Sequence, residues 1–181
     1  MLEKVIATNE TIRELVRDAI NKYGPNCDLN FIDVSRVTDM SWLFNSSPFT
    51  GDISGWDVSN VTDMSYMFAH SVFNGNIGGW VVSKVTNMTC VFHDSQFNGD
   101  ISGWNVGNVT NMYAMFDSSK FNGDLGKWKV SKATELSQMF KNSPFSGDVG
   151  KWKVPKTANM FNMFEGTPLE MERRLPQWYR Y

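Results

Sequence analysis

Residues 49–72 read FTGDISGWDVSNVTDMSYMFAHSV, and nearly the same segment begins again at positions 73, 97, 121 and 145. Its first residue, Phe49, recurs as Phe73, Phe97, Phe121 and Phe145. A fixed repeat of this length is typical of a solenoid, because one unit is too small to bury its own apolar face and must stack on its neighbours. The period therefore predicts an elongated stack of similar coils.

Alignment of the chain with itself at this interval separates columns that stay apolar from columns that vary. We expect four apolar columns to form the interior, and Ile32 takes the tryptophan position in the first, incomplete unit. The columns are Trp56, Trp80, Trp104, Trp128 and Trp152; Val34, Val58, Val82, Val106, Val130 and Val154; Met40, Met64, Met88, Met112, Leu136 and Met160; and Phe44, Phe68, Phe92, Phe116, Phe140 and Phe164.

Each unit is predicted to contain one short strand and one short helix. The alternation in Trp56–Ser59 is typical of a strand that pairs in parallel with its copies above and below. Thr62 stands where a helix cap belongs, and Met64, Met67 and Phe68 follow at helical spacing. The last unit has Ala158 in place of this threonine, so its helix is expected to fray. The same cap is predicted at Thr38, Thr86, Thr110 and Thr134.

The segments that flank the repeats are predicted to be caps. Apolar residues from Ile12 to Tyr23 recur at helical spacing, Thr8 or Asn9 can cap this helix, and Gly24-Pro25 ends it. The repeat pattern breaks down again after Leu169. We therefore divide the chain into an N-terminal helical cap (1–26), a solenoid of 24-residue repeats (27–167) and a C-terminal cap (168–181).

These elements predict an α/β repeat fold, a right-handed β/α solenoid of about six coils with short parallel strands, short helices and terminal caps. Strands stack about 4.8 Å apart and helices about 8 to 10 Å apart, so such a stack is expected to bend or twist. The composition, with 41% hydrophobic residues, 20% charged residues and a net charge of −2, is that of a globular protein. Two cysteines, Cys27 and Cys90, exclude a disulfide framework and are expected to be reduced packing residues.

The repeat resembles that of a known family. Residues 26–40, NCDLNFIDVSRVTDM, are similar to the opening of BspA-like leucine-rich repeat surface proteins, and residues 97–112, FNGDISGWNVGNVTNM, resemble their repeat. Pro168-Leu169 to Trp178-Tyr179 resemble their closing segment. The resemblance implies a leucine-rich-repeat-like, noncatalytic domain of bacterial surfaces and some viruses, with adhesion or protein binding assigned to some members. It implies a cell-surface or secreted location, whereas Met1–Glu14 lacks the pattern of a signal peptide, which leaves cytoplasmic and virion-associated locations open.

No residue pattern indicates catalysis or a cofactor. His70 and His93 have no nucleophile in a recurrent relation to them, and we interpret both as surface histidines. A column of carboxylates could supply oxygen ligands for calcium. Each member follows a glycine at a turn, where Asp and Asn accept backbone N–H bonds, so turn formation is the first interpretation and calcium the alternative. The column is Asp52, Asp100, Asp124 and Asp148, with Asn76 in the same position.

Charge is distributed unevenly along the chain. Residues 1–119 hold 6 Lys and Arg against 13 Asp and Glu, a net charge of −7, while residues 120–181 hold 11 against 6, a net charge of +5. Lysines gather around Trp128 and Trp152, and we predict a partner-binding site there. The alternative is a solvated edge that discourages strand pairing. The candidate residues are Lys127, Lys129, Lys132, Lys151, Lys153 and Lys156.

Two functions fit these patterns. The first is a noncatalytic scaffold that binds a protein or an anionic glycan, in adhesion or surface recognition. The second is a structural component of a larger assembly, such as a virion or surface layer, with self-association through the oppositely charged ends. No stretch approaches the roughly 20 apolar residues that a membrane helix requires, and nucleic acid is not expected as a partner.

Overall fold

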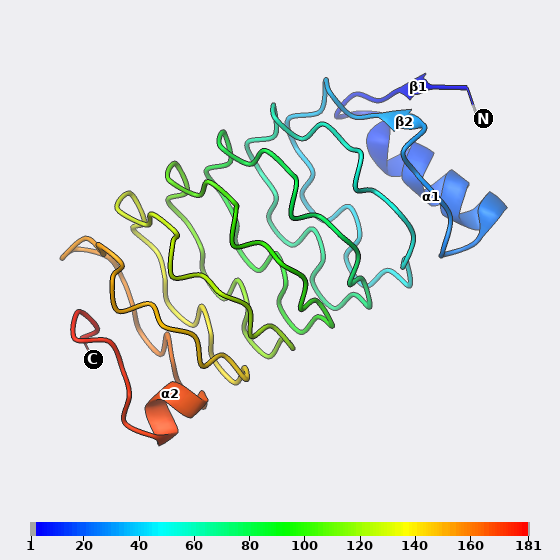
Figure 1. Cartoon of the computed structure of the whole chain (residues 1–181). Coiled ribbons are helices and arrows are strands. Elements are labelled where there is room, and N and C mark those ends of the chain that lie inside the picture. The colour runs from blue at the N-terminus through cyan, green and yellow to red at the C-terminus, as the bar shows by residue number, and fades with distance from the viewer. Residues whose placement is uncertain (1–2, 181) are drawn as a thin grey trace.

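The computed structural model describes residues 3–180 of the chain (Figure 1). Among them, strand β1 and strand β2 pair in parallel, with Val5 opposite Ile32. The helices and strands are β1 (Val5–Ile6), α1 (Ile12–Tyr23), β2 (Ile32–Asp33) and α2 (Pro168–Met171).

Most of the chain lies between β2 and α2 as irregular coils, one for each repeat of the sequence. Figure 1 shows these coils as loops that lie one behind another along one axis, with α1 at one end and α2 at the other. Backbone hydrogen bonds join each coil to the next. We number the coils from first to sixth for residues 25–48, 49–72, 73–96, 97–120, 121–144 and 145–168.

The apolar columns form the interior of this stack, as predicted. In the Phe44 column, successive rings lie nearly parallel, with centroids 5.4 to 5.7 Å apart. Each tryptophan of the Trp56 column donates its Nε1–H to a carbonyl of the preceding coil over 2.9 to 3.2 Å. The tryptophans are therefore in register. Only Val154, in the last coil, is partly exposed.

The prediction of a short helix in each repeat is wrong. Within residues 3–180 the only α-helices are α1 and α2. In the second coil, the N–H groups of Met67 and Ala69 bond to carbonyls three residues earlier and form turns. The N–H groups of Tyr66 and Phe68, which alternate with them, bond instead to carbonyls of the third coil, at 2.8 and 2.9 Å. Half of the backbone N–H groups in this segment thus donate to the next coil, whereas in an α-helix they would donate to carbonyls of the same helix.

Left-handed backbone conformations accompany these turns. Tyr66 has φ 57° and His70 has φ 56°, and the same two positions have positive φ in all six coils. Side chains other than glycine disfavour this conformation, and it ends a helix wherever it occurs. In the first five coils the N–H of each such residue donates to a carbonyl of the next coil, and these bonds stabilise the conformation.

The threonine column does not cap helices. The exposed hydroxyl of Thr62 donates to the Thr38 carbonyl of the preceding coil over 3.2 Å, and Thr86, Thr110 and Thr134 repeat this bond. The prediction that a helix frays at Ala158 is therefore wrong, because the sixth coil, as the structure describes it, has no helix there.

The strand predicted at Trp56–Ser59 is also absent. The N–H of Trp56 bonds to the Ile53 carbonyl, and the N–H of Val61 bonds to the Val58 carbonyl, so turns of the same coil use these donors. Isolated parallel bridges occur instead beside the threonines, in the column of Asp39, Asp63, Asn87, Asn111, Glu135 and Asn159. Because the described coils contain no helix before α2, the reason for the predicted bend disappears. The right-handed sense of the coil and the domain boundaries stay predictions.

Helix α1 closes the first coil. Its residues Ile12, Val16 and Ala19 are buried, and it ends at Gly24, whose φ is 90°. Its N-cap is Thr11, without a side-chain cap bond, so the predicted cap at Thr8 or Asn9 is wrong. The Asn9 side chain instead accepts the N–H groups of Thr38 and Asp39 and donates to the Thr38 hydroxyl. At the open edge of the first coil, the Asn9 amide thus supplies the hydrogen-bond acceptor that a preceding coil would otherwise supply.

The C-terminal segment closes the sixth coil. Thr167 caps α2 by accepting the Glu170 N–H. Trp178 stacks on Trp152 with centroids 6.0 Å apart and donates Nε1–H to the Val149 carbonyl, so it extends the tryptophan column beyond the repeats. In the part of the chain that the structure describes, no helix is long and apolar enough to cross a membrane.

Candidate ligand-binding face

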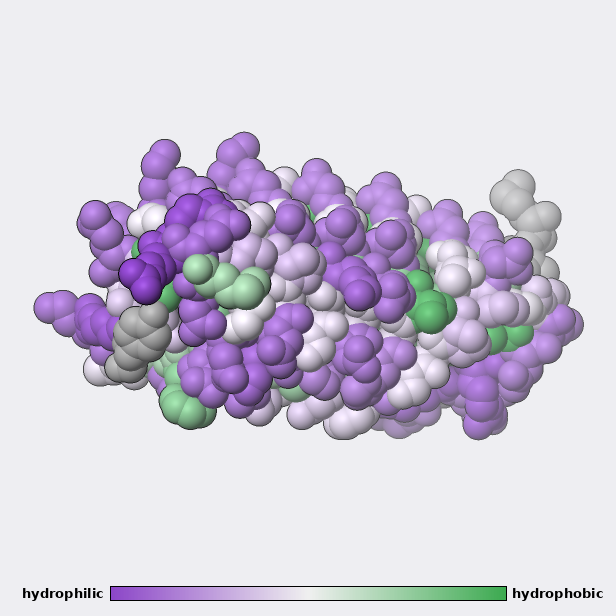
Figure 2. All heavy atoms as spheres, turned by 90° about the horizontal axis from the view of Figure 1, so that it is seen from below, coloured by the Kyte–Doolittle hydropathy of each residue, from purple (hydrophilic) through white to green (hydrophobic). Residues whose placement is uncertain are grey.

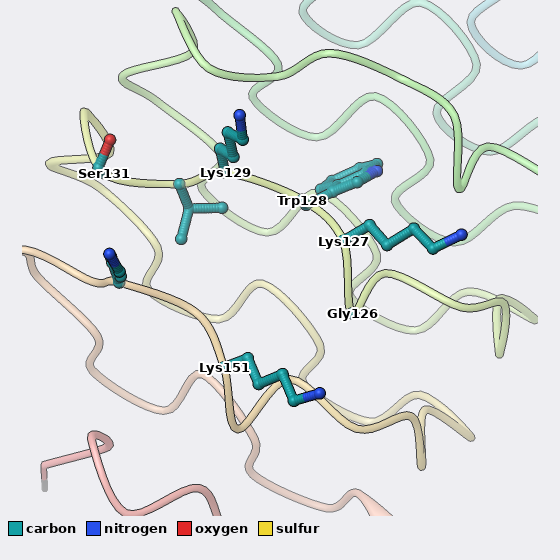
Figure 3. Close-up of a pocket in the computed structure, with 8 residues that line it drawn as sticks. Gly126, Lys127, Trp128, Lys129, Ser131 and Lys151 are labelled. Carbon is teal, nitrogen blue, oxygen red and sulfur yellow. The ribbon is translucent and has the colours of Figure 1, made fainter.

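All six candidate lysines belong to the fifth and sixth coils and are exposed, and four of them, Lys127, Lys129, Lys151 and Lys153, border one hollow. We call the lysine-bearing surface of these two coils the basic face. Lys127 and Lys129 flank Trp128, which is only 3% exposed, because successive residues here alternate between solvent and interior. Lys151 and Lys153 flank Trp152 in the same way. Figure 3 shows Lys127 and Lys151 extending in the same direction from neighbouring coils.

Two shallow hollows lie on the basic face. The first, of about 270 Å³, is bordered by Lys127 and Lys129 of the fifth coil and by Lys151 and Lys153 of the sixth, and Gly126 and Ser131 also line it (Figure 3). The second, of about 340 Å³, lies one coil earlier. It is again bordered by Lys127 and Lys129, and it is lined by Ser102, Gly103, Trp104, Asn105 and Val106 of the fourth coil.

Most of the lysine charge on the basic face is uncompensated. Lys132 Nζ donates to Asn108 Oδ1 over 2.6 Å, as Lys84 does to Asn60 two coils earlier. In residues 3–180, no hydrogen bond or ion pair engages the ammonium groups of the other five lysines. Lys127 acts electrostatically on the carboxylate of Asp100. The pKa of Asp100 is lowered mainly by hydrogen bonds from the backbone and hydroxyl of Ser102, and to a lesser degree by the charge of Lys127.

The same columns carry other residues in the earlier coils. Where the fifth and sixth coils have Lys129 and Lys153, the first and second have Asp33 and Asp57. Both aspartates are ionised at neutral pH, and hydrogen bonds from Ser35 and Ser59 lower their pKa further. The Lys127 column is occupied by Gly55, Gly79 and Gly103 in the second, third and fourth coils. One continuous surface therefore passes from acidic to basic along the stack.

Large apolar patches are not a feature of the molecular surface seen in Figure 2. That view shows mostly hydrophilic residues with scattered hydrophobic spots. None of the large hydrophobic residues that are exposed in the described chain lines either hollow. Charge, rather than apolar surface, therefore distinguishes the basic face.

The aspartate column makes turns. Asp52 Oδ1 accepts the N–H of Ser54 over 2.8 Å, and Asn76, Asp100, Asp124 and Asp148 each accept the N–H two residues later. In the described part of the chain, no group of three or more His, Cys, Asp or Glu side chains could hold a metal ion.

The two histidines take part in contacts between coils. His70 Nδ1 lies 3.0 Å from Asp94 Oδ2, and His93 Nδ1 lies 3.3 Å from Asp117 Oδ2, with the two rings 5.0 Å apart. The Asp117 carboxylate raises the pKa of His93 by stabilising the imidazolium. Lys141 and Glu165 form a similar pair at 2.9 Å in later coils. These pairs join successive coils away from the basic face.

Both cysteines are free, as expected. Cys90 is buried and Cys27 is half-buried, and burial raises the pKa of both thiols.

Sequence reasoning missed the glycines that line the hollows and the role of Asn108. Gly126 lines one hollow and Gly103 the other, and a side chain at Gly103 would meet no atom within 4 Å. The glycine column that precedes Lys127 was visible at the period of the repeat. The Lys84–Asn60 and Lys132–Asn108 pairs also follow the period, since each joins equivalent positions of successive repeats.

Neither a curated protein nor a solved structure matches the chain. A family model described as "Mycoplasma protein of unknown function, DUF285" matches it twice, over residues 11–116 and 69–178. The two overlapping matches span nearly all of the coils, as expected of a protein built from repeats. The chain therefore belongs to this family and is a repeat protein.

Proposed function

We propose that this protein is a noncatalytic binding scaffold that presents its basic face to an acidic protein or an anionic glycan. The observation that carries this proposal is the group of five exposed lysines without a bound counter-charge on two adjacent coils. Like charges held so close together repel one another, and an anionic partner relieves that repulsion. The surrounding stack of hydrogen-bonded coils supplies a rigid support.

The biological setting that we propose is adhesion or recognition at a surface. The resemblance of the repeat to BspA-like leucine-rich repeat surface proteins supports this setting, and so does the proposed classification of the stack as a leucine-rich-repeat-like solenoid.

The test is reversal of four charges together, Lys127→Glu, Lys129→Glu, Lys151→Glu and Lys153→Glu. We expect capture of the protein on immobilised heparin or polyglutamate to fall about tenfold or more, because the attraction depends on several simultaneous charges. The melting temperature should change little, since all four side chains are exposed. Replacement of the same lysines by arginine keeps the charge and is the matched control. Unchanged capture, or no capture of the unaltered protein at low salt, contradicts the proposal.

A second candidate is a structural component of an assembly, joined end to end. The net charges of −7 over residues 1–119 and +5 over residues 120–181 favour it, because opposite ends attract. Light scattering at low salt and high protein concentration tests it. Salt-sensitive oligomers support this role, and a monomer under these conditions excludes it.

A further inference from the structure

We infer that the ligand of the basic face is a linear, sulfated glycan that lies along the stack and crosses the fourth, fifth and sixth coils. This inference rests on the proposed function and specifies its partner. It starts from the two hollows, which share Lys127 and Lys129 as their common border. A ligand that follows the stack would meet one hollow, then this pair of lysines, then the other hollow.

The protein surface along this line of lysines lets a glycan chain approach the protein backbone. Gly103 lines the earlier hollow, and a side chain built there would meet no atom within 4 Å. Ser102 and Asn105 line the same hollow, and Ser131 lines the later one. Polar groups such as these can hydrogen-bond to sugar hydroxyls, while the lysines pair with anionic substituents.

The charge density favours sulfate over carboxylate. Five lysines without a bound counter-charge lie on two adjacent coils, whose Phe140 and Phe164 rings stack with centroids 5.5 Å apart. A sulfated glycan carries several anionic groups per disaccharide, and they stay ionised at every physiological pH. Hyaluronate, whose only anionic groups are carboxylates on alternate sugars, has fewer charges per unit length and would leave some of the lysines unpaired.

Two other classes of macromolecule fit the path less well. Single-stranded nucleic acid binds through exposed aromatic rings on which bases stack, whereas Trp104 and Trp128 are each only 3% exposed. Protein interfaces normally bury a core of aromatic or aliphatic side chains, and no exposed large hydrophobic residue of the described chain lines the hollows.

Titration of the intact protein with heparin oligosaccharides of defined length tests the inference. We expect affinity per chain to rise about tenfold or more from a disaccharide to a chain that crosses both hollows, because the second contact becomes intramolecular. Hyaluronate of equal length, which carries only carboxylates, should bind more weakly. Equal binding of hyaluronate, equal binding of a homopolymeric RNA at the same charge, or affinity that is independent of length would each overturn the inference.

Two glycines supply a matched pair of variants. Gly103→Phe should fill the earlier hollow and remove most of the gain with length, while a disaccharide should bind as before. Gly79→Phe is the control, because Gly79 occupies the same column one coil earlier, and a side chain there also meets no atom within 4 Å. Both variants should therefore keep the melting temperature of the unaltered protein. Equal affinity of the two variants for long chains would contradict the proposed path.

The same positions allow a gain of binding. Gly103→Lys extends the column of Lys127 and Lys151 by one coil and should tighten binding of long chains, whereas Gly79→Lys lies outside the path and should have a smaller effect. If polyglutamate is captured through the four lysines but no oligosaccharide binds, the inference of a glycan ligand is wrong and the proposed function stands. If neither polyglutamate nor any oligosaccharide binds, the proposed function itself fails.

Discussion

The first and second coils and the fifth and sixth coils have the same interior and opposite surfaces. Phe44 and Phe68 stack in the early coils with a centroid distance of 5.4 Å, and Phe140 and Phe164 stack in the late coils at 5.5 Å. On the outside, Asp33 and Asp57 of the early coils give way to lysines in the late ones. The comparison teaches that packing constrains the inward columns, while the outward columns can change their charge without altering the coil.

Core substitutions test whether the two regions share one interior, and they should have the largest effect. We expect Phe68→Ala and Phe140→Ala each to lower the free energy of unfolding by about 3 to 5 kcal/mol, because both rings are fully buried and would leave cavities. Urea denaturation measures both values. The exposed Val81→Ala is the control and should stay within about 0.5 kcal/mol. Costs that differ by more than about 2 kcal/mol between the two phenylalanines would break the comparison.

The open edge of the first coil should show the next largest effect. Asn9→Ala removes the acceptor of two backbone N–H groups and the donor to the Thr38 hydroxyl, at a cost of about 1 to 3 kcal/mol. Hydrogen exchange should accelerate at Thr38 and Asp39 and stay slow at Thr86, which bonds to a neighbouring coil. Asn9→Asp keeps the acceptor and should restore part of the protection. Unchanged exchange at Thr38 would show that the side chain does not seal the edge.

The ion pairs between coils predict a smaller, pH-dependent effect at His93. Asp117 raises the pKa of His93 in the folded state. The imidazolium therefore contributes its full stability when the pH is below the pKa of His93 in the unfolded state, which is about 6.5. That contribution is lost as the pH rises through the folded pKa. The difference in melting temperature between the unaltered protein and Asp117→Asn should therefore be larger near about pH 5.5 than near about pH 8.5. A constant difference would argue against the pair.

The threonine column should show the smallest effect. Thr86→Ala removes an exposed hydroxyl that donates to the Thr62 carbonyl over 3.3 Å, and we expect a cost of about 0.5 kcal/mol. Ala158 already occupies this column in the sixth coil. Chemical denaturation of the single variant measures the cost, with Ser83→Ala as a control in the same coil. A loss above about 2 kcal/mol would show that the hydroxyl bond does more than supplement the backbone bond beside it.

Much of the interior could be predicted from the sequence, because the same side-chain types return in every repeat. The stacking of Trp178 on Trp152 could not be predicted from the period. The position one repeat after Trp152 is occupied by Pro176, not by a tryptophan. The lysines of the basic face were also found from their column. The hollows between them were not, because they depend on how neighbouring coils are spaced in three dimensions.

The helices were predicted wrongly for a physical reason. Met64, Met67 and Phe68 are spaced as they would be on a helix, and Tyr66 is a bulky residue that rarely adopts the left-handed conformation. The His70 column, which includes Asp94, Asn142 and Gly166, does favour this conformation, whereas nothing local marks the Tyr66 position as left-handed. The conformation becomes favourable because the N–H of Tyr66 finds the carbonyl of Thr89 in the next coil.

The sequence by itself determined the period, the inward columns and the change of charge along the surface, since each depends only on which side chains recur. The tertiary structure alone decided the backbone conformation of the coils, the seal at Asn9 and the path between the lysines. These features depend on hydrogen-bond partners and surfaces contributed by residues of a neighbouring coil, far away in the chain. Such partners are brought together only when the coils stack.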